Sequence, residues 1–317
     1  MDLFRRNLPW IIAFALAVIL VAGYQYTFSP PDDFPSGSIV SITRGASATE
    51  VAQELASMHL IKHPGLLRLF FRISGTGGGI HSGAYLFPSP ENLFVVAYRL
   101  LSGAYGLPPV RLTFIEGITA REIADQVAGE FEIPAKDFLQ EARQYEGYLF
   151  PDTYLFPPSS TAASIVATMR ENFETKIATL AGDIQASGRS LSDTVILASL
   201  VEKEARQSES RRMVAGILLN RLKLGMPLQV DAVFGYIFNR DTYSPSFADL
   251  KVESPYNTYT HTGLPPGSIN NPGLDALEAV LNPTKTDYLY YLTGTDDLMH
   301  YATTYAGHQA NQRKYLP

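Results

Sequence analysis

The first clear pattern in the chain is an uncharged, largely apolar run from Leu8 to Tyr24, which Arg5 and Arg6 precede. Its length is at the lower limit of the ~17–25 residues that cross a bilayer as a helix. Arginines before such a run predict an N-terminus in the cytoplasm. We therefore predict a cytoplasmic tail over 1–7, a retained transmembrane helix over 8–24 and a linker over 25–38. A cleaved signal peptide is the alternative interpretation of the same run.

Two later segments, residues 40–55 and 112–127, share a second pattern. Each starts as a short alternating strand, turns at a glycine and continues into an N-capped helix with one apolar face. Ser47 and Thr119 are the predicted caps, and a glutamate three residues after each completes a capping box. The copies resemble LysM modules, small βααβ units that often bind glycans containing N-acetylglucosamine. We assign 39–145 to a LysM-like repeat region, with a purely structural repeat as the alternative.

From Glu146 onward the pattern changes to aromatic residues between prolines, followed by segments with helical periodicity. We expect a second domain over 146–317 with a mixed α+β fold, because helices and strands do not alternate regularly. Helices are predicted over 162–180, 192–206, 209–224 and from Pro272 with Asn271 as its cap, and strands over 228–231 and 288–292.

Composition then narrows the possible functions. Hydrophobic residues make up 46% and charged residues 18% of the chain, as in ordinary folded proteins. The net charge of −6, without a basic stripe, disfavours binding to nucleic acid. The chain has no cysteine, which excludes disulfides, thiolate metal sites and a thiol nucleophile. The histidines show no His-Glu-x-x-His pattern, so a zinc hydrolase is disfavoured, and we expect neither a metal nor another cofactor.

The helix predicted over 192–206 carries the strongest candidate for chemistry. Leu197, Leu200 and Val201 form an apolar stripe at helical spacing, and Glu204 is the next position on it. Burial of a carboxyl group raises its pKa, as a general acid near neutral pH requires. A buried salt bridge between Glu204 and a nearby arginine is the alternative.

The neighbouring glutamate is interpreted differently. Glu202 lies on another face of the predicted helix, four residues before Arg206. This spacing is typical of an exposed ion pair that contributes little to stability.

Residues 255–269 combine aromatic, amide and hydroxyl side chains between prolines. Tyrosine rings stack on sugar rings, and Asn or Thr side chains hydrogen-bond hydroxyl and acetamido groups. The segment is therefore a candidate carbohydrate-binding loop, and a proline-rich structural turn is the alternative. Candidate contacts to a glycan are Gln229, Tyr256, Asn257 and Tyr259.

Several long motifs occur in one order along the chain and together resemble a known family. They are Glu146-Gly-Tyr-Leu-Phe-Pro-Asp-Thr-Tyr154, Ile196-Leu-Ala-Ser-Leu-Val-Glu-Lys-Glu204, Asn220-Arg-Leu, Leu228-Gln-Val-Asp231 and Tyr256-Asn-Thr-Tyr-x-x-x-Gly-Leu-Pro-Pro-Gly267. Over essentially the whole chain, they are similar to the endolytic murein transglycosylases MltG/YceG. The helix also resembles the Glu-Ser helix of other lytic transglycosylases, although Ala205 stands here where a hydroxyl residue commonly follows.

The resemblance implies a bacterial lyase that cleaves the β-1,4 bond between N-acetylmuramic acid and N-acetylglucosamine in nascent peptidoglycan. The cut is non-hydrolytic, leaves a 1,6-anhydromuramyl end and would terminate strand elongation. Glu204 would be the single acid/base, whereas Asp231 or Glu253 would be the second carboxylate of a hydrolytic muramidase. A noncatalytic peptidoglycan-binding scaffold is the other alternative.

The same resemblance implies a cellular location and a set of binding partners. We expect a single-pass protein of the bacterial inner membrane, with its catalytic domain over 146–317 on the extracytoplasmic side. The expected partners are glycan strands, the lipid bilayer and cell-wall synthases.

Overall fold

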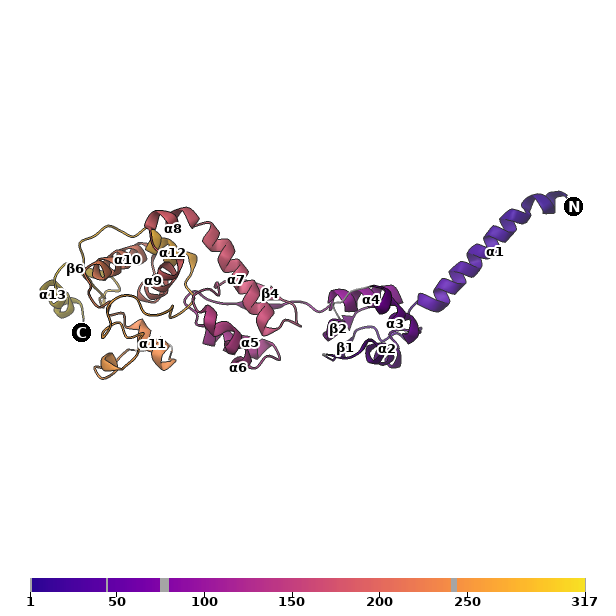
Figure 1. Ribbon diagram of the computed structural model, residues 1–317, viewed down its shortest axis with the longest axis horizontal. Helices are drawn as coiled ribbons and strands as arrows, with labels where there is room; N and C mark the ends of the chain where they lie inside the picture. Colours follow the sequence, from indigo (N-terminus) through magenta and orange to yellow (C-terminus); the bar gives the residue numbers. More distant parts are fainter. Residues whose placement is uncertain (1, 44, 75–79, 241–243, 317) are drawn as a thin grey trace. The chain divides into compact units, whose positions relative to one another are not determined.

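The computed structural model describes residues 2–43, 45–74, 80–240 and 244–316 of the chain (Figure 1). The predicted mixed α+β class is confirmed, with small two-stranded sheets among many helices. The chain forms two compact units. The first is Met1–Val110 with Phe156–Ser159, and the second is Arg111–Leu155 with Ser160–Pro317.

The first unit contains a βααβ arrangement built on the first sequence copy. Its elements are β1 (Ser38–Ile42), α2 (Ala48–Ser57), α3 (Pro64–Ile73) and β2 (Gly83–Phe87), followed by α4 (Leu93–Ser102). β1 and β2 are antiparallel, with Val40 opposite Tyr85. The capping box predicted at Ser47 is present. The Ser47 side chain accepts a hydrogen bond from the Glu50 amide, and the Glu50 carboxylate accepts one from the Ser47 amide. The apolar faces close a separate core around Leu55 and Leu67.

Ahead of this unit's sheet, α1 (Asp2–Phe28) covers the apolar run in the sequence. Its apolar side chains are exposed, among them Phe14 and Leu20. At its end, the Phe28 ring stacks on Phe94 of α4, with 4.6 Å between ring centroids. In the described part of the chain, no helix combines the length and apolarity needed to cross a bilayer.

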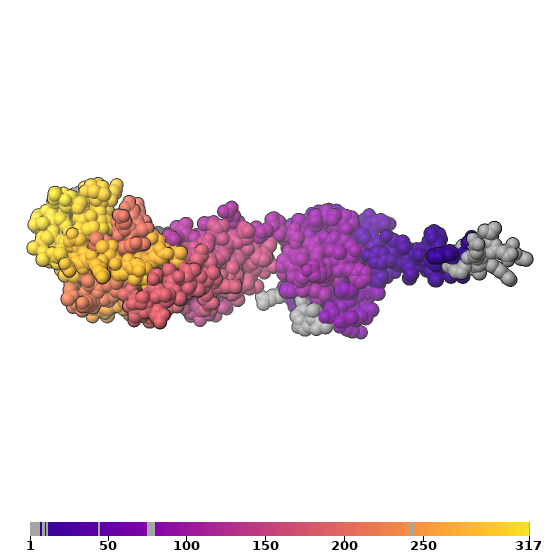
Figure 2. Space-filling view, turned by 90° about the horizontal axis from the view of Figure 1, so that it is seen from above, coloured from indigo at the N-terminus to yellow at the C-terminus, as the bar shows by residue number. Residues whose placement is uncertain are grey.

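The second copy has the same order of elements but belongs to the second unit. It comprises β3 (Val110–Thr113), α5 (Ala120–Glu130), α6 (Ala135–Ala142), the 3-10 turn η1 (Arg143–Tyr145) and β4 (Thr153–Phe156), and β3 pairs with β4. The capping box at Thr119 is present. The compact unit therefore begins at Arg111 rather than at the predicted 146. In Figure 2, the surface of this unit continues from magenta residues to the orange and yellow C-terminal residues. The likeness of either copy to LysM stays a prediction.

The rest of the second unit surrounds one buried helix, α9 (Leu191–Glu204). Every residue from Thr194 to Val201 is buried, so this helix has no solvent-facing side over that stretch. Figure 1 shows α9, α10 and α12 side by side. The remaining elements are α7 (Ala162–Ala178), α8 (Ala181–Ser187), α10 (Ser208–Lys223), α11 (Ala232–Phe238), the 3-10 turn η2 (Asp249–Lys251), α12 (Leu274–Leu281), β5 (Tyr290–Thr293), β6 (Met299–Ala302) and α13 (Tyr305–Tyr315).

Two local expectations, a strand over 228–231 and a helix cap at Asn271, are wrong. Residues 228–231 form no strand, because Gln229 adopts a left-handed backbone with φ 51°, which breaks an extended run. Asn271 caps no helix, since α12 begins at Leu274 after Gly273. The cap of α9 is Ser190, whose side chain accepts a hydrogen bond from the Asp193 amide at 3.0 Å.

Candidate functional site

The last residue of α9 is Glu204, the residue that the apolar stripe singled out. Its carboxyl group accepts a hydrogen bond from the Tyr291 hydroxyl of β5 at 2.8 Å. Burial raises the pKa of Glu204 to about 7, and the Asp231 carboxylate adds to this, while the hydrogen bond from Tyr291 opposes it. Glu204 can therefore carry a proton near neutral pH and release it to a reacting group, as a general acid must.

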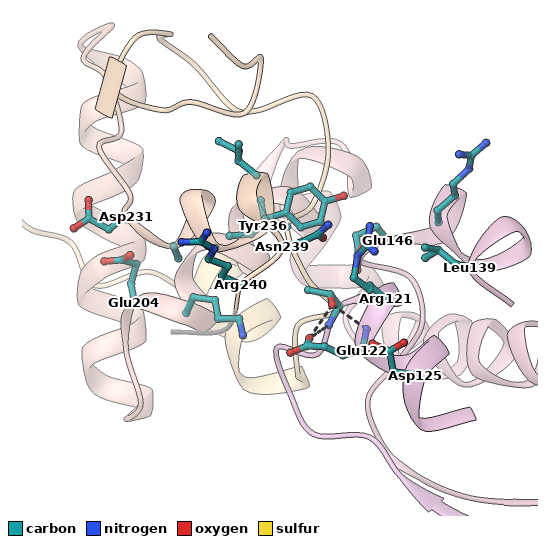
Figure 3. Close-up of a pocket in the computed structure, with 17 residues that line it drawn as sticks. Arg121, Glu122, Asp125, Leu139, Glu146, Glu204, Asp231, Tyr236, Asn239 and Arg240 are labelled. Carbon is teal, nitrogen blue, oxygen red and sulfur yellow. Dashed lines mark hydrogen bonds between the residues drawn. The ribbon is translucent and has the colours of Figure 1, made fainter. Parts of the chain in front are cut away.

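Glu204 lies in a cavity of about 790 Å³ in the second unit. In Figure 3, Glu204 and Asp231 lie together at one end, and Asp125 and Leu139 lie at the other. The walls come from α5 and α6 of the second copy, from the end of α9 and from α11. The full lining is Thr119, Arg121, Glu122, Asp125, Leu139, Arg143, Glu146, Lys203, Glu204, Asp231, Ala232, Gly235, Tyr236, Ile237, Asn239, Arg240 and Ile269.

Asp231 is the second carboxyl group at the Glu204 end of the cavity. It is exposed and accepts a hydrogen bond from the Tyr259 hydroxyl. Of the two candidates for a second catalytic carboxylate, the structure thus brings Asp231 beside Glu204. Glu253 is exposed and does not line the cavity.

Glu146 also lines the cavity, and the sequence analysis identified it only as part of a motif. Burial raises its pKa to about 7. Its carboxyl oxygens accept hydrogen bonds from the Ala120 amide, at 2.9 and 3.2 Å, and from the Asn271 side chain at 3.0 Å. Asn271 in turn accepts from the amides of Gly147 and Leu149. Glu146 therefore ties the start of α5 to the residues before α12.

The interpretation of Glu202 as an exposed partner of Arg206 is wrong. Its side chain is only 4% exposed, and it pairs with Arg211 of α10 at 2.5 Å. Its second oxygen accepts from the Gly273 amide at 2.9 Å. Arg211 also contacts Asp275 at 2.7 Å. α9 is buried nearly all round, so the face opposite the stripe meets other helices rather than water.

None of the four predicted glycan contacts is among the lining residues of the cavity. Asn257 is fully buried, and its side chain bonds the carbonyls of Leu250 and Val252 and the Tyr259 amide, so it shapes the loop. Gln229 is exposed, and Tyr256 packs its ring on Tyr236, with 5.1 Å between centroids. A direct role in glycan binding stays a prediction for Gln229, Tyr256 and Tyr259.

The raised pKa values of Glu146 and Glu204 give a testable dependence of stability on pH. Both pKa values are raised from 4.5 to about 7, so the native chain holds protons that the unfolded chain releases. Their contribution is fully present below the unfolded value and is lost as pH rises through about 7. We expect the melting temperature to fall between about pH 5 and about pH 7.5. Glu146→Gln should flatten this slope in thermal melts, and an unchanged slope would show that Glu146 is ionised in the native chain.

The fold and the cavity together define a class: an α+β protein with a candidate acid–base site at the end of a buried helix. A glutamic acid, a tyrosine donor and a second carboxylate form that site. The chain belongs to the YceG-like family, whose model matches residues 40–314. The resemblance seen in the sequence is confirmed.

Two curated relatives share one name. An endolytic murein transglycosylase of Bacillus subtilis is 29% identical over 305 residues, covering 87% of this chain and 84% of the relative. The protein of the same name from Streptococcus pneumoniae is 28% identical over 359 residues, and the match spans 97% of this chain but 65% of that longer relative. The crystal structure of a YceG-like protein from Listeria monocytogenes has a TM-score of 0.59 and 27% identity, covering 87% of this chain and 99% of that one.

Proposed function

We propose that this chain is an endolytic murein transglycosylase, a lyase that cuts peptidoglycan strands internally, with Glu204 as its acid/base. The observation that carries the proposal is a glutamic acid with a pKa of about 7 in a cavity, in a chain whose relatives are named for this activity. One residue that can both give and take a proton near neutral pH suits a reaction without an external nucleophile.

The proposed reaction has two proton transfers. Glu204 first donates its proton to the glycosidic oxygen between N-acetylmuramic acid and N-acetylglucosamine, and that bond breaks. The resulting carboxylate then removes the proton from the muramyl 6-hydroxyl, whose oxygen bonds to the anomeric carbon of the same sugar. Because the nucleophile belongs to the substrate, its proximity lowers the entropic part of the barrier. Glu204 ends protonated and ready for another cycle.

The Tyr291 hydroxyl acts on both states of Glu204. It donates a hydrogen bond to the carboxylate, which stabilises the charged form after the first proton transfer. Burial and the Asp231 charge favour the protonated form that begins the cycle. The two opposing influences keep the pKa close to neutral, where each transfer has a small energetic cost.

This proposal predicts the ends of the product strands. We expect products from purified glycan strands to end in 1,6-anhydro-N-acetylmuramic acid, because an intramolecular oxygen replaces water. Mass spectrometry in water enriched in oxygen-18 measures this directly. The Glu204→Gln variant, which lacks the proposed acid/base, is the inactive control. Reducing muramic acid ends that contain oxygen-18 would contradict the proposal.

A hydrolytic muramidase is the second candidate, and the position of Asp231 favours it. A glycosidase that uses water requires a second carboxylate to activate that water or to attack the sugar. Asp231 lies beside Glu204 in the cavity and is exposed. However, Asp231 already accepts a hydrogen bond from Tyr259. The experiment with oxygen-18 separates the two candidates.

Attachment to the inner membrane, with the catalytic unit outside the cytoplasm, is a further part of the proposal. It is supported by Arg5 and Arg6 ahead of the run from Leu8 to Tyr24, and by the exposed apolar side chains of α1. We expect the full chain in the membrane fraction of cells and resistant to extraction with carbonate. A mature soluble form beginning near Gly23 would contradict it. Association with cell-wall synthases likewise stays a prediction from the resemblance.

A further inference from the structure

The α5–α6 side of the cavity carries charges of both signs. α5 contributes Arg121 and Asp125, Arg143 follows α6, and Leu139 of α6 adds an apolar side chain. The three charged residues are exposed toward the cavity or its rim. Within the described residues, none of the three has an ion pair or a side-chain hydrogen bond. These charges therefore do not stabilise the fold through pairing, and they are available to a ligand.

The charged side chains on the α5–α6 side of the cavity do not match the chemical groups of the glycan backbone alone. The sugar backbone presents hydroxyl and acetamido groups, and its muramyl carboxyl group is consumed in the amide bond to the peptide stem. Neutral groups of this kind are ordinarily met by amide, hydroxyl and aromatic side chains. Guanidinium groups, by contrast, match carboxylates with paired hydrogen bonds. The neighbouring Asp125 and Glu122 disfavour a polyanion such as a pyrophosphate, because like charges repel it.

We infer that the wall formed by Arg121, Asp125, Leu139 and Arg143 binds the peptide stem of the muramyl residue. A stem carries free carboxylates and a free amine on a short peptide rich in methyl groups. The arginines match its carboxylates, Asp125 its amine, and Leu139 its methyl groups. The inference rests on the proposed function and specifies its substrate as a strand that still carries stems.

The position of this wall relative to Glu204 is fixed by buried contacts. Glu146 bonds the Ala120 amide, next to Arg121, and it also bonds Asn271. Asn271 also donates two hydrogen bonds to the Ile118 carbonyl, one from its side chain at 3.0 Å and one from its backbone amide at 2.8 Å. The start of α5 is thereby held against the residues that precede α12, which packs on α9. A stem held at α5 and a glycosidic bond held at Glu204 thus have a defined separation.

Binding to the uncleaving full chain, Glu204→Gln, tests the inference apart from catalysis. Two probes are used: a glycan tetrasaccharide with tetrapeptide stems, and the same tetrasaccharide after an amidase has removed them. We expect calorimetry to show at least about tenfold tighter binding of the probe that carries stems. Adding Arg121→Ala and Arg143→Ala should remove this difference and leave binding of the bare probe unchanged.

The matched control is Arg111→Ala, an exposed arginine of the same unit outside the cavity. It should retain the preference for stems. Equal affinity for the two probes, or equal loss of both in the double variant, would overturn the inference. Competition by inorganic pyrophosphate as strong as by a free stem peptide would reduce the wall to a general anion surface and also overturn it. Failure of the proposed function appears separately, as an absence of cleavage by the chain that retains Glu204.

Discussion

Glu204→Gln is expected to lower turnover on purified glycan strands by ~10²–10⁴-fold while the chain remains folded. Glutamine keeps the size of the side chain and can still accept the hydrogen bond from Tyr291, but it has no proton to transfer near neutral pH. The measurement is the rate of appearance of new strand ends, with thermal melts to confirm folding.

Glu209→Gln is the matched control, because Glu209 is an exposed residue in the first turn of α10, outside the cavity. It should retain turnover close to that of the unchanged chain. If Glu204→Gln retained turnover and Glu146→Gln abolished it, the acid/base role would belong to Glu146. That result is a real test, since burial raises the pKa of both groups to about 7.

Glu202→Gln is expected to destabilise the chain by about 2–3 kcal/mol, since it removes a buried charge-assisted hydrogen bond. The change leaves Arg211 with Asp275 as its near partner, so the loss should be smaller than for an arginine left unpaired. The Gly273 amide, at 2.9 Å from Glu202, would also face a weaker acceptor. Urea denaturation measures the free energy of unfolding. The variants Glu202→Gln, Arg211→Gln and their combination form a double-mutant cycle for this pair.

In that cycle, the double variant should lose less than the sum of the single variants, because each single change already breaks the same pair. Glu209→Gln is again the control and should change stability by at most about 0.5 kcal/mol. A Glu202→Gln chain as stable as the unchanged chain would show that the pair with Arg211 contributes nothing. Turnover per folded molecule should persist at a reduced level, since Glu202 holds α9 in place without lining the cavity.

The features that sequence predicted well are those whose causes are local. A capping box needs only residues three positions apart, and both Ser47 and Thr119 form one. The helix over Ala162–Ala178 follows its own periodicity from a Thr161 cap. The stripe through Leu197, Leu200 and Val201 placed Glu204 correctly at the edge of the core. Residues three or four positions apart lie on the same face of a helix, so this position depends only on local spacing.

The features that sequence missed depend on distant partners. Glu202 is buried because Arg211 and Gly273 meet it from two other segments. The pKa of Glu146 is raised because distant segments of the chain bury its carboxyl group, although the hydrogen bonds from Ala120 and Asn271 lower that pKa. A periodic pattern assigns one buried face and one exposed face, so it fails for a helix such as α9 that is surrounded on all sides.

The left-handed backbone at Gln229 was also not predicted, and it too depends on a distant partner. The run from Leu228 to Asp231 alternates as a strand does, but the Gln229 amide bonds the Thr258 carbonyl at 3.0 Å, and the backbone there has φ 51°. That partner lies in the 255–269 loop, so tertiary contacts override the local preference for a strand.

The sharing of the cavity between the second βααβ copy and the C-terminal helices limits how such a chain can change over evolution. The first copy closes its own core, so whole copies could be gained, lost or exchanged on that side of Arg111 without altering the cavity. The second copy cannot be exchanged in this way, because its residues line the cavity. Exchanging it would remove Arg121 and the Ala120 partner of Glu146 together. We therefore expect the residues of the second unit to be inherited together, although half of the sequence repeat lies among them.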